Sequence, residues 1–472
     1  MAAASEVQVL ETTFVKPSEA TPGDGLWVSP LDLEMAHAGH TPTVYLYSAT
    51  GAADFFDVAR IKASLAKALA AFYPLAGRLG ADESGRIQIS CTGEGVLFVV
   101  ARADGVTLAD IKDVKPSPEL TRQFVPRVEP RTLMLAIQVT FLKCGGVALG
   151  TSLHHISIDA PSAFHFFSTW SAISRDGDGA VLEPPCHDRT LLRARSPPRV
   201  HPDALSTFYP RLIFSGPARP AVSEVFVVSK GQVAALRRVS GGTSTFCAVA
   251  ALVWQCACAA RRLPPDSEAR LTFPGNVRRR ISPPLPDRYF GNALIVLSVA
   301  GPARGVTEAG LDAVAGRIRG AIRRLDDELV RSAIDYFELD DEERVPMKGA
   351  LAESNLQIIS WLGMPMYDAD FGWGGPLHMS RAESVRGGFV YLMNDGPTED
   401  DGVRVLMCME AENMEALARV LNEKLRCVEE EAAANLVVKQ QEAQAAKNTT
   451  PTPTPIKEPE RVLYPAELPA AS

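Results

Sequence analysis

Apolar residues recur at helical spacing in four parts of the chain. Residues 55–72 carry an apolar position every three or four residues, and the predicted helix ends before Pro74 because proline disfavours helical geometry in the residue before it. A second pattern follows Pro161 and places Phe164, Phe167, Trp170 and Ile173 on one face. A third helix is predicted to begin at Ser244, and a further helix near 414–427 closes the pattern.

Strands are predicted where β-branched and aromatic residues gather between turn residues. Residues 133–142 and 147–153 flank a Lys-Cys-Gly-Gly turn, so they predict a hairpin. Shorter strands are expected at 44–47, 222–228, 294–299 and 389–393. Helices and strands therefore alternate along the chain, which favours mixed α/β layers built around two sheets.

A proline-rich stretch without sustained periodicity separates two patterned regions. We predict an N-terminal domain over 1–190, a crossover linker over 191–221 and a C-terminal domain over 222–436. Beyond these, residues 437–472 are predicted to be a disordered tail because they are rich in Gln, Ala, Thr and Pro.

Composition narrows the class of protein. The 472 residues include 48 Lys and Arg against 56 Asp and Glu, a net charge of −8, and 46% are hydrophobic. Such a chain has enough apolar surface to fold, and it lacks the basic excess of a general nucleic-acid binder. An anionic ligand would therefore need a local basic patch.

Cysteine spacing and the ends of the chain add three expectations. None of the eight cysteines has zinc-type spacing, so no metal site is expected from them. Neither a signal peptide nor an apolar run long enough to span a bilayer is visible. We therefore expect a soluble, reduced, cytoplasmic protein without membrane partners.

The segment His155-Ile-Ser-Ile-Asp159 is the leading candidate for chemistry. His155 directly follows the predicted hairpin, and Asp159 stands before Pro161, where a helix cap with proline in the first turn would lie. A neutral imidazole can take a proton from an acceptor and return it to a leaving group. The alternative is structural, namely two histidines that end a strand beside polar caps.

A second candidate is the turn Asp370-Phe-Gly-Trp-Gly374. Its glycines permit positive φ or close backbone approach, and its acid could anchor the turn. Trp373 could pack across a domain seam or direct its indole N–H at a ligand. For Asp370 a structural role is the default interpretation.

Taken together, these two motifs resemble the plant BAHD family of acyl-CoA-dependent acyltransferases. They match its H-x-x-x-D and D-F-G-W-G motifs, and 72–79, 244–254 and 283–292 agree as well. The resemblance implies two similar-sized mixed-sheet domains with flanking helices, as in chloramphenicol acetyltransferase, joined by a long crossover loop. It also implies an active site in a channel at the domain interface.

The resemblance assigns roles to the motif residues. His155 would be the general base, and Asp159 would brace the loop, paired with Arg280. Asp370 is sometimes credited with accepting a proton in this family, although we favour a structural role. The D-F-G-W-G turn would sit between the domains, where Trp373 or a backbone N–H could stabilise an oxyanion.

Two further segments, 40–47 and 360–365, resemble the hydroxycinnamoyl transferase branch. Members that act on shikimate or quinate carry an arginine where this chain has Gly363, so an alcohol or amine acceptor without a carboxylate is favoured. Thr43 and Tyr45 could line the acyl or acceptor pocket, and plain strand packing is the alternative. Contacts with coenzyme A are assigned to four residues: Ser244, Thr245, Arg278 and Arg280.

The expected function is transfer of a hydroxycinnamoyl group, such as p-coumaroyl, from coenzyme A to a hydroxyl or amine. The thioester is then a substrate, and no cofactor is expected. The partners would be small-molecule substrates and no nucleic acid, and the protein would be a monomer. Alternatives are a benzoyl-CoA amine N-acyltransferase and a catalytically silent binding protein of the same fold. A zinc site formed by His154, His155 and His165 is a third possibility in principle.

Overall fold

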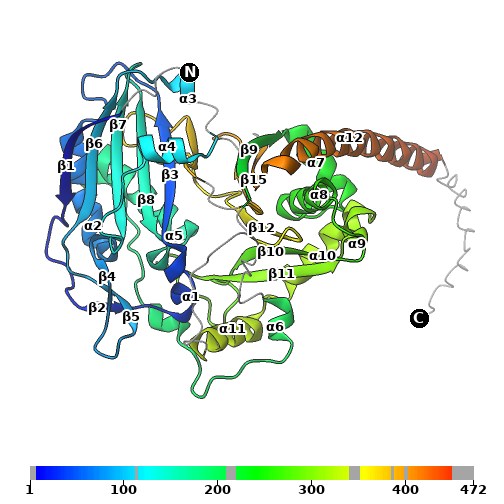
Figure 1. The fold of residues 1–472 in the computed structure, drawn as a ribbon, viewed down its shortest axis with the longest axis horizontal. Coiled ribbons are helices and arrows are strands. Elements are labelled where there is room, and N and C mark those ends of the chain that lie inside the picture. The colour runs from blue at the N-terminus through cyan, green and yellow to red at the C-terminus, as the bar shows by residue number, and fades with distance from the viewer. Residues whose placement is uncertain are drawn as a thin grey trace, which may run out of the picture.

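Two six-stranded mixed sheets, each covered by helices, form the two halves of the molecule (Figure 1). The structure is a computed structural model that describes residues 7–111, 115–208, 219–339, 351–383, 387–397 and 402–448. This architecture confirms the predicted fold class of two mixed-sheet domains with flanking helices.

The first sheet has the strand order β1-β6-β7-β8-β3-β13. Its strands from the N-terminal half are β1 (Gln8–Val15), β3 (His40–Tyr47), β6 (Val96–Ala103), β7 (Leu135–Leu142) and β8 (Val147–His154). The antiparallel pairing of β7 with β8 confirms the predicted hairpin. A small third sheet contains β2 (Gly25–Trp27), β4 (Arg78–Ala81) and β5 (Ile87–Ser90).

Helices α2 (Val58–Ala71) and α5 (Ala160–Asp176) cover one face of this sheet. Both begin at a capping aspartate: Asp57 accepts a hydrogen bond from the Arg60 N–H, and Asp159 accepts one from the Ser162 N–H. Trp170 of α5 is buried in the same core as Phe98 of the sheet. Shorter helices in this half are α1 (Pro30–Leu33), α3 (Leu108–Ile111) and α4 (Pro118–Phe124).

The second sheet has the order β11-β10-β12-β14-β15-β9. Its strands are β9 (Ala221–Val228), β10 (Glu268–Asn276), β11 (Leu294–Pro302), β12 (Asn355–Ser360), β14 (Phe389–Asn394) and β15 (Val403–Glu410). The helices of this half are α6 (Ala204–Thr207), α7 (Lys230–Val239), α8 (Thr245–Ala260), α9 (Arg304–Thr307), α10 (Leu311–Arg323), α11 (Asp327–Leu339) and α12 (Ala411–Asn448). Helix α8 is apolar on all sides and is buried at the centre, as its sequence pattern requires.

One strand crosses from the second half of the chain into the first sheet. β13 (His378–Arg381) pairs antiparallel with β3, so that Arg381 lies opposite Thr43 and Met379 opposite Tyr45. The predicted C-terminal domain of 222–436 included this strand, whereas the structure places it in the first sheet. This crossing joins the two halves along residues 43–46 of β3.

The predicted tail is partly wrong. Helix α12 continues to Asn448 and extends away from the rest of the second half (Figure 1), although residues 437–472 were expected to be disordered. Between 437 and 448 the chain consists mainly of Ala, Gln, Glu and Lys, which are strong helix formers. The prediction of disorder considered only the low complexity of the sequence and not this helix propensity. Residues 449–472 lie outside the described residues. Across the described ranges, no helix combines the length and the apolar character that crossing a bilayer requires.

Candidate active site

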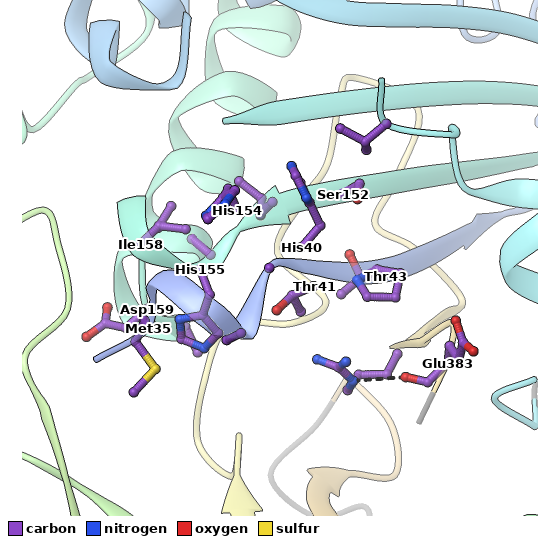
Figure 2. A pocket seen from close by; sticks show the side chains of 18 of the residues that line it. Met35, His40, Thr41, Thr43, Ser152, His154, His155, Ile158, Asp159 and Glu383 are labelled. Atoms are coloured by element: carbon purple, nitrogen blue, oxygen red, sulfur yellow. Dashed lines mark hydrogen bonds between the residues drawn. The ribbon is translucent and has the colours of Figure 1, made fainter. Parts of the chain in front are cut away.

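A cavity of about 1060 Å³ opens between the two sheets beside the end of β8. Of the predicted site residues, it is lined by Thr43, Tyr45, His155 and Asp159. Figure 2 shows His155 between Met35 and Asp159 on one side and Thr41, Thr43 and Glu383 on the other. The sequence thus identified one wall of the cavity, formed by β3 and the end of β8.

Part of the cavity wall consists of aromatic side chains that no single sequence segment contains. They come from β3, α5, the residue after β12, and β14: Tyr45, Phe164, Phe167, Trp361, Phe389 and Tyr391. Phe164 packs edge-on to Trp361 with ring centroids 6.0 Å apart, and Trp361 packs in the same way on Tyr391 at 5.8 Å. This wall suits a flat aromatic group.

Local structure turns His155 toward the cavity. β8 ends at His154, whose Nδ1 accepts a hydrogen bond from the Ile156 N–H, and residues His155–Ser157 form one turn of 3₁₀ helix. The His155 N–H donates to the Gly39 carbonyl at 2.8 Å, which fixes the backbone at this turn. His154 and His155 therefore point in different directions, and both line the cavity (Figure 2).

The His155 imidazole is held in its neutral form. Burial lowers its pKa below 6.5 and the nearby Arg381 charge adds to this shift, while Asp159 and Asn292 oppose it. Its Nδ1 is buried and has no hydrogen-bond partner among the described residues. An imidazole that lines a cavity and whose neutral form is favoured can serve as a general base.

This burial predicts the pH profile of the reaction. Since the pKa of His155 is lowered, kcat/KM should be level at neutral pH and fall on acidification through an apparent pKa below 6.5. The measurement is kcat/KM against pH, restricted to the range in which circular dichroism shows an intact fold. A midpoint above 7 would contradict the assignment of the base.

Asp159 points away from the reaction centre and forms a buried ion pair. Its carboxylate contacts Arg278 at 2.7 and 2.9 Å and accepts hydrogen bonds from the Ser162 and Ala293 N–H groups at 3.1 Å each. Burial is the largest single effect and would raise the pKa of Asp159, but the Arg278 charge together with the hydrogen bonds from Arg278, Ala293 and Ser162 lowers the pKa overall. Asp159 is therefore a positioning residue that caps α5 and joins the two halves.

The partner of Asp159 is Arg278, and the expected pairing with Arg280 is wrong. Arg280 is exposed, whereas Arg278 is buried and also donates to the Tyr289 and Gly291 carbonyls. Because its guanidinium is engaged in this way, Arg278 is not placed to contact coenzyme A. Arg278 and Arg280 lie on the same turn but face opposite ways. A run of three arginines in the sequence does not show which of them is buried.

A second buried network holds the carbonyl groups of the His155 loop. Arg189 donates to the Ser157 carbonyl at 2.7 Å and pairs with Asp32 at 3.2 Å. Asn292 donates to the His155 carbonyl at 2.8 Å and to Asp32 at 3.0 Å. Sequence reasoning missed Asp32 and Arg189, for which it offered no signal. Asn292 belonged to a quoted motif but received no role.

Asp370 anchors its own turn. Its Oδ1 accepts hydrogen bonds from the Gly372 and Gly374 N–H groups at 2.8 and 2.9 Å. Both glycines have positive φ, +109° and +95°, which other residues rarely adopt. Asp370 does not line the cavity, so its geometry supports the structural role and gives no contact for proton transfer.

The rest of the D-F-G-W-G turn packs on the first half of the molecule. Phe371 is buried against Trp170, with the two ring centroids 4.7 Å apart. Trp373 stacks on Phe56 with ring centroids 5.4 Å apart. The guanidinium carbon of Arg60 lies over the Trp373 ring, 4.5 Å from its centroid. The turn, which belongs to the second half of the chain, therefore packs on residues of the first half. Trp373 also does not line the cavity, so it is not placed to stabilise an oxyanion there.

The remaining predicted contacts lie away from the cavity. Ser244 caps α8 by accepting a hydrogen bond from the Cys247 N–H, and Thr245 is the first residue of that helix. Gly363 is exposed with φ of +71° and does not line the cavity, although Trp361 two residues earlier does. His165 bonds the Glu183 carbonyl, apart from His154 and His155. Within the described ranges, no group of three or more His, Cys, Asp or Glu side chains could hold a metal ion.

Two solved structures share this arrangement of two helix-covered mixed sheets. The fold resembles vinorine synthase, with a TM-score of 0.69 and 24% identity over 87% of this chain and 96% of that one. It also resembles TRI101 of F. sporotrichioides, solved with coenzyme A and T-2, with a TM-score of 0.67 and 16% identity over 84% and 97% of the two chains.

Residues 5–423 match the Transferase family, and the chain belongs to this family, the BAHD acyl-CoA-dependent acyltransferases. It is 43% identical over 453 residues to putrescine hydroxycinnamoyltransferase 1 of Oryza sativa subsp. japonica, covering 89% of this chain and 100% of that relative. It is 39% identical to a hydroxycinnamoyltransferase of Narcissus pseudonarcissus and 37% identical to shikimate O-hydroxycinnamoyltransferase of Nicotiana tabacum. Each of these matches covers 88% of this chain and 99% of the relative.

Proposed function

We propose that this acyltransferase moves a hydroxycinnamoyl group, such as p-coumaroyl, from coenzyme A to a small amine. The observation that carries the proposal is the neutral His155 imidazole beside an aromatic-walled cavity of about 1060 Å³. The named activities of its relatives support the donor, and the 43% identical relative that is named for putrescine supports an amine acceptor.

The chemistry is direct transfer with His155 as general base. The acceptor nitrogen attacks the thioester carbonyl carbon while His155 takes the proton that the nitrogen loses. The tetrahedral intermediate then collapses, the carbon–sulfur bond breaks, and the imidazolium returns the proton to the departing thiolate. Amide and free coenzyme A are the products, and no other reactant is needed. General acid–base catalysis of this kind contributes about 10²–10⁴ in rate.

Carboxylates at the cavity support a cationic acceptor. Glu34, Glu129 and Glu383 line it together with Arg127, Arg131 and Arg381, and Glu129 is paired with exposed Arg127. A diamine can present one neutral nitrogen to His155 while its second, charged nitrogen contacts a carboxylate. The resemblance places an arginine at the position of Gly363 in enzymes that use carboxylate-bearing acceptors. The glycine in this chain agrees with a preference for a cationic acceptor.

Glu383 is the carboxylate whose removal we expect to affect the acceptor. Glu383→Gln should raise KM for putrescine about 10-fold, because hydrogen bonds to charged groups contribute roughly 1.5–3 kcal/mol. KM for p-coumaroyl-CoA should stay unchanged. The measurement is steady-state kinetics with each substrate varied in turn. An equal rise in both KM values would contradict a role in acceptor binding.

A matrix of donors and acceptors tests the proposal as a whole. p-Coumaroyl-, caffeoyl-, feruloyl- and benzoyl-CoA are each incubated with putrescine, agmatine, tryptamine, glycerol, shikimate and quinate, and products are identified by mass. Hydroxycinnamoyl amides should dominate. A preference for benzoyl-CoA or for carboxylate-bearing acceptors would refute the proposal, and a lack of any product would favour a silent binding protein.

The same proposal includes a cytoplasmic monomer that needs no cofactor. Substrates enter as small molecules, and coenzyme A leaves as a product. Size-exclusion chromatography with light scattering tests the monomer, and full activity after chelation and desalting tests the absence of a cofactor.

A further inference from the structure

Five arginines are buried in the described part of the chain, and one of them lacks a carboxylate partner. Four of the five form ion pairs with nitrogen–oxygen distances of 2.7–3.2 Å. These pairs are Arg189–Asp32, Arg261–Glu410, Arg278–Asp159 and Arg404–Asp395. Arg381 is 8% exposed and forms no ion pair with any described residue. Since a buried charge without a partner is costly, the exception points to a ligand.

Arg381 lies in the wall of the catalytic cavity. It is the last residue of β13, its Nε donates to the Glu383 carbonyl at 3.2 Å, and its guanidinium lies 4.8 Å from the centre of the Tyr391 ring. These contacts hold the guanidinium plane and leave its terminal N–H groups for the cavity. The position is therefore fixed before any substrate binds.

The surroundings of Arg381 are a polar row within the aromatic wall. Across the neighbouring strands β13, β3 and β8, Arg381 lies opposite Thr43, and Thr43 lies opposite Thr151. The hydroxyl oxygens of Thr43 and Thr151 are 2.5 Å apart. The next row contains Met379 and Tyr45, of which Tyr45 adds a phenolic hydroxyl to the cavity wall. Arg381 is the one residue of these two rows that carries a charged hydrogen-bond donor.

The spacing from this row to His155 suits the length of the proposed acyl group. His155 follows Thr151 by four residues, so their Cα atoms lie about 13 Å apart at roughly 3.3 Å per residue. In Figure 2 Thr43 and Glu383 lie further along the wall than His155 does. An extended acyl group with its carbonyl at His155 would point its ring along this wall toward the polar row.

We propose that Arg381 donates a hydrogen bond to the ring oxygen of the acyl donor, and that it makes the enzyme selective for ring-hydroxylated donors. This inference rests on the proposed function. A phenolic oxygen has a lone pair that can accept a hydrogen bond, and a charged guanidinium donor strengthens such a bond. A cationic amine acceptor, in contrast, is repelled by Arg381 and has the carboxylates of the cavity for its charge.

Two donors that differ only in the ring hydroxyl test the proposal. In Arg381→Met, kcat/KM for p-coumaroyl-CoA should fall about 10- to 100-fold, the effect of losing a hydrogen bond to a charged group. With cinnamoyl-CoA, which lacks the oxygen, kcat/KM should be unchanged, and this second donor reports on folding in the same variant. Arg381→Lys should recover part of the loss, and Arg102→Met, which removes an exposed charge from β6, should match wild type with both donors.

Three results would overturn the proposal. These are an equal loss with both donors, no loss with either, and a loss that depends on whether the acceptor bears a carboxylate. The third would assign Arg381 to the acceptor. Failure of the proposed function looks different, because the wild-type enzyme would then transfer no hydroxycinnamoyl group to any amine.

Discussion

Replacing His155 by alanine should lower kcat for hydroxycinnamoyl transfer by about 10²–10⁴-fold or more, because the reaction loses the group that moves its proton. The fold should be intact, since the loop around His155 is held through backbone groups: Asn292 and Arg189 bond its carbonyls, and the His155 N–H bonds Gly39. The measurement is the rate of thiol release with saturating p-coumaroyl-CoA and putrescine.

The matched control for this variant is His201→Ala, which removes an exposed imidazole from the crossover region. Its rate should equal that of wild type. Thermal unfolding of both variants separates loss of chemistry from loss of fold. A His155→Ala enzyme that retains full activity would remove His155 from the mechanism.

Asp159→Ala should destabilise the protein by about 3–5 kcal/mol, because it leaves the Arg278 charge buried without its partner. Activity should fall as well, since Asp159 caps α5 directly after the His155 turn. The measurement is the free energy of unfolding in urea. Arg280→Ala is the control, because Arg280 is exposed and should leave stability unchanged.

The double variant Asp159→Leu with Arg278→Met sharpens this test. Replacing a buried ion pair by apolar residues is often close to neutral, so the double variant should be more stable than Asp159→Ala. The lowered pKa of Asp159 adds a pH dependence: its contribution is complete above the unfolded pKa of about 3.9 and is lost as the pH falls through the lower folded value. A change below about 1 kcal/mol in Asp159→Ala would contradict the importance of the pair.

Local features of the fold and site were predictable because they depend on neighbouring residues. The β7–β8 hairpin follows from alternating apolar residues around a glycine turn, and Asp159 before Pro161 marks the start of α5. These two elements together place His155 at a strand end. The motif resemblance then supplied the family, which the comparisons confirm.

Contacts between distant segments were not predictable. Whether Arg278 or Arg280 meets Asp159 depends on how one turn of the second half faces α5, and spacing alone leaves that open. In the same way, the pairing of β13 with β3 brings Arg381 opposite Thr43, 338 positions earlier in the chain. The D-F-G-W-G turn was recognised, but its packing on Trp170 and Phe56 is a tertiary contact that its own sequence does not specify.

The central claim is direct transfer between two bound substrates at His155, and thiol release from p-coumaroyl-CoA tests it most directly. The account predicts that free thiol appears only when an amine acceptor is present, in amounts equal to the amide formed. A burst of one equivalent of thiol per enzyme in the absence of acceptor would show an acyl-enzyme intermediate and would contradict this account.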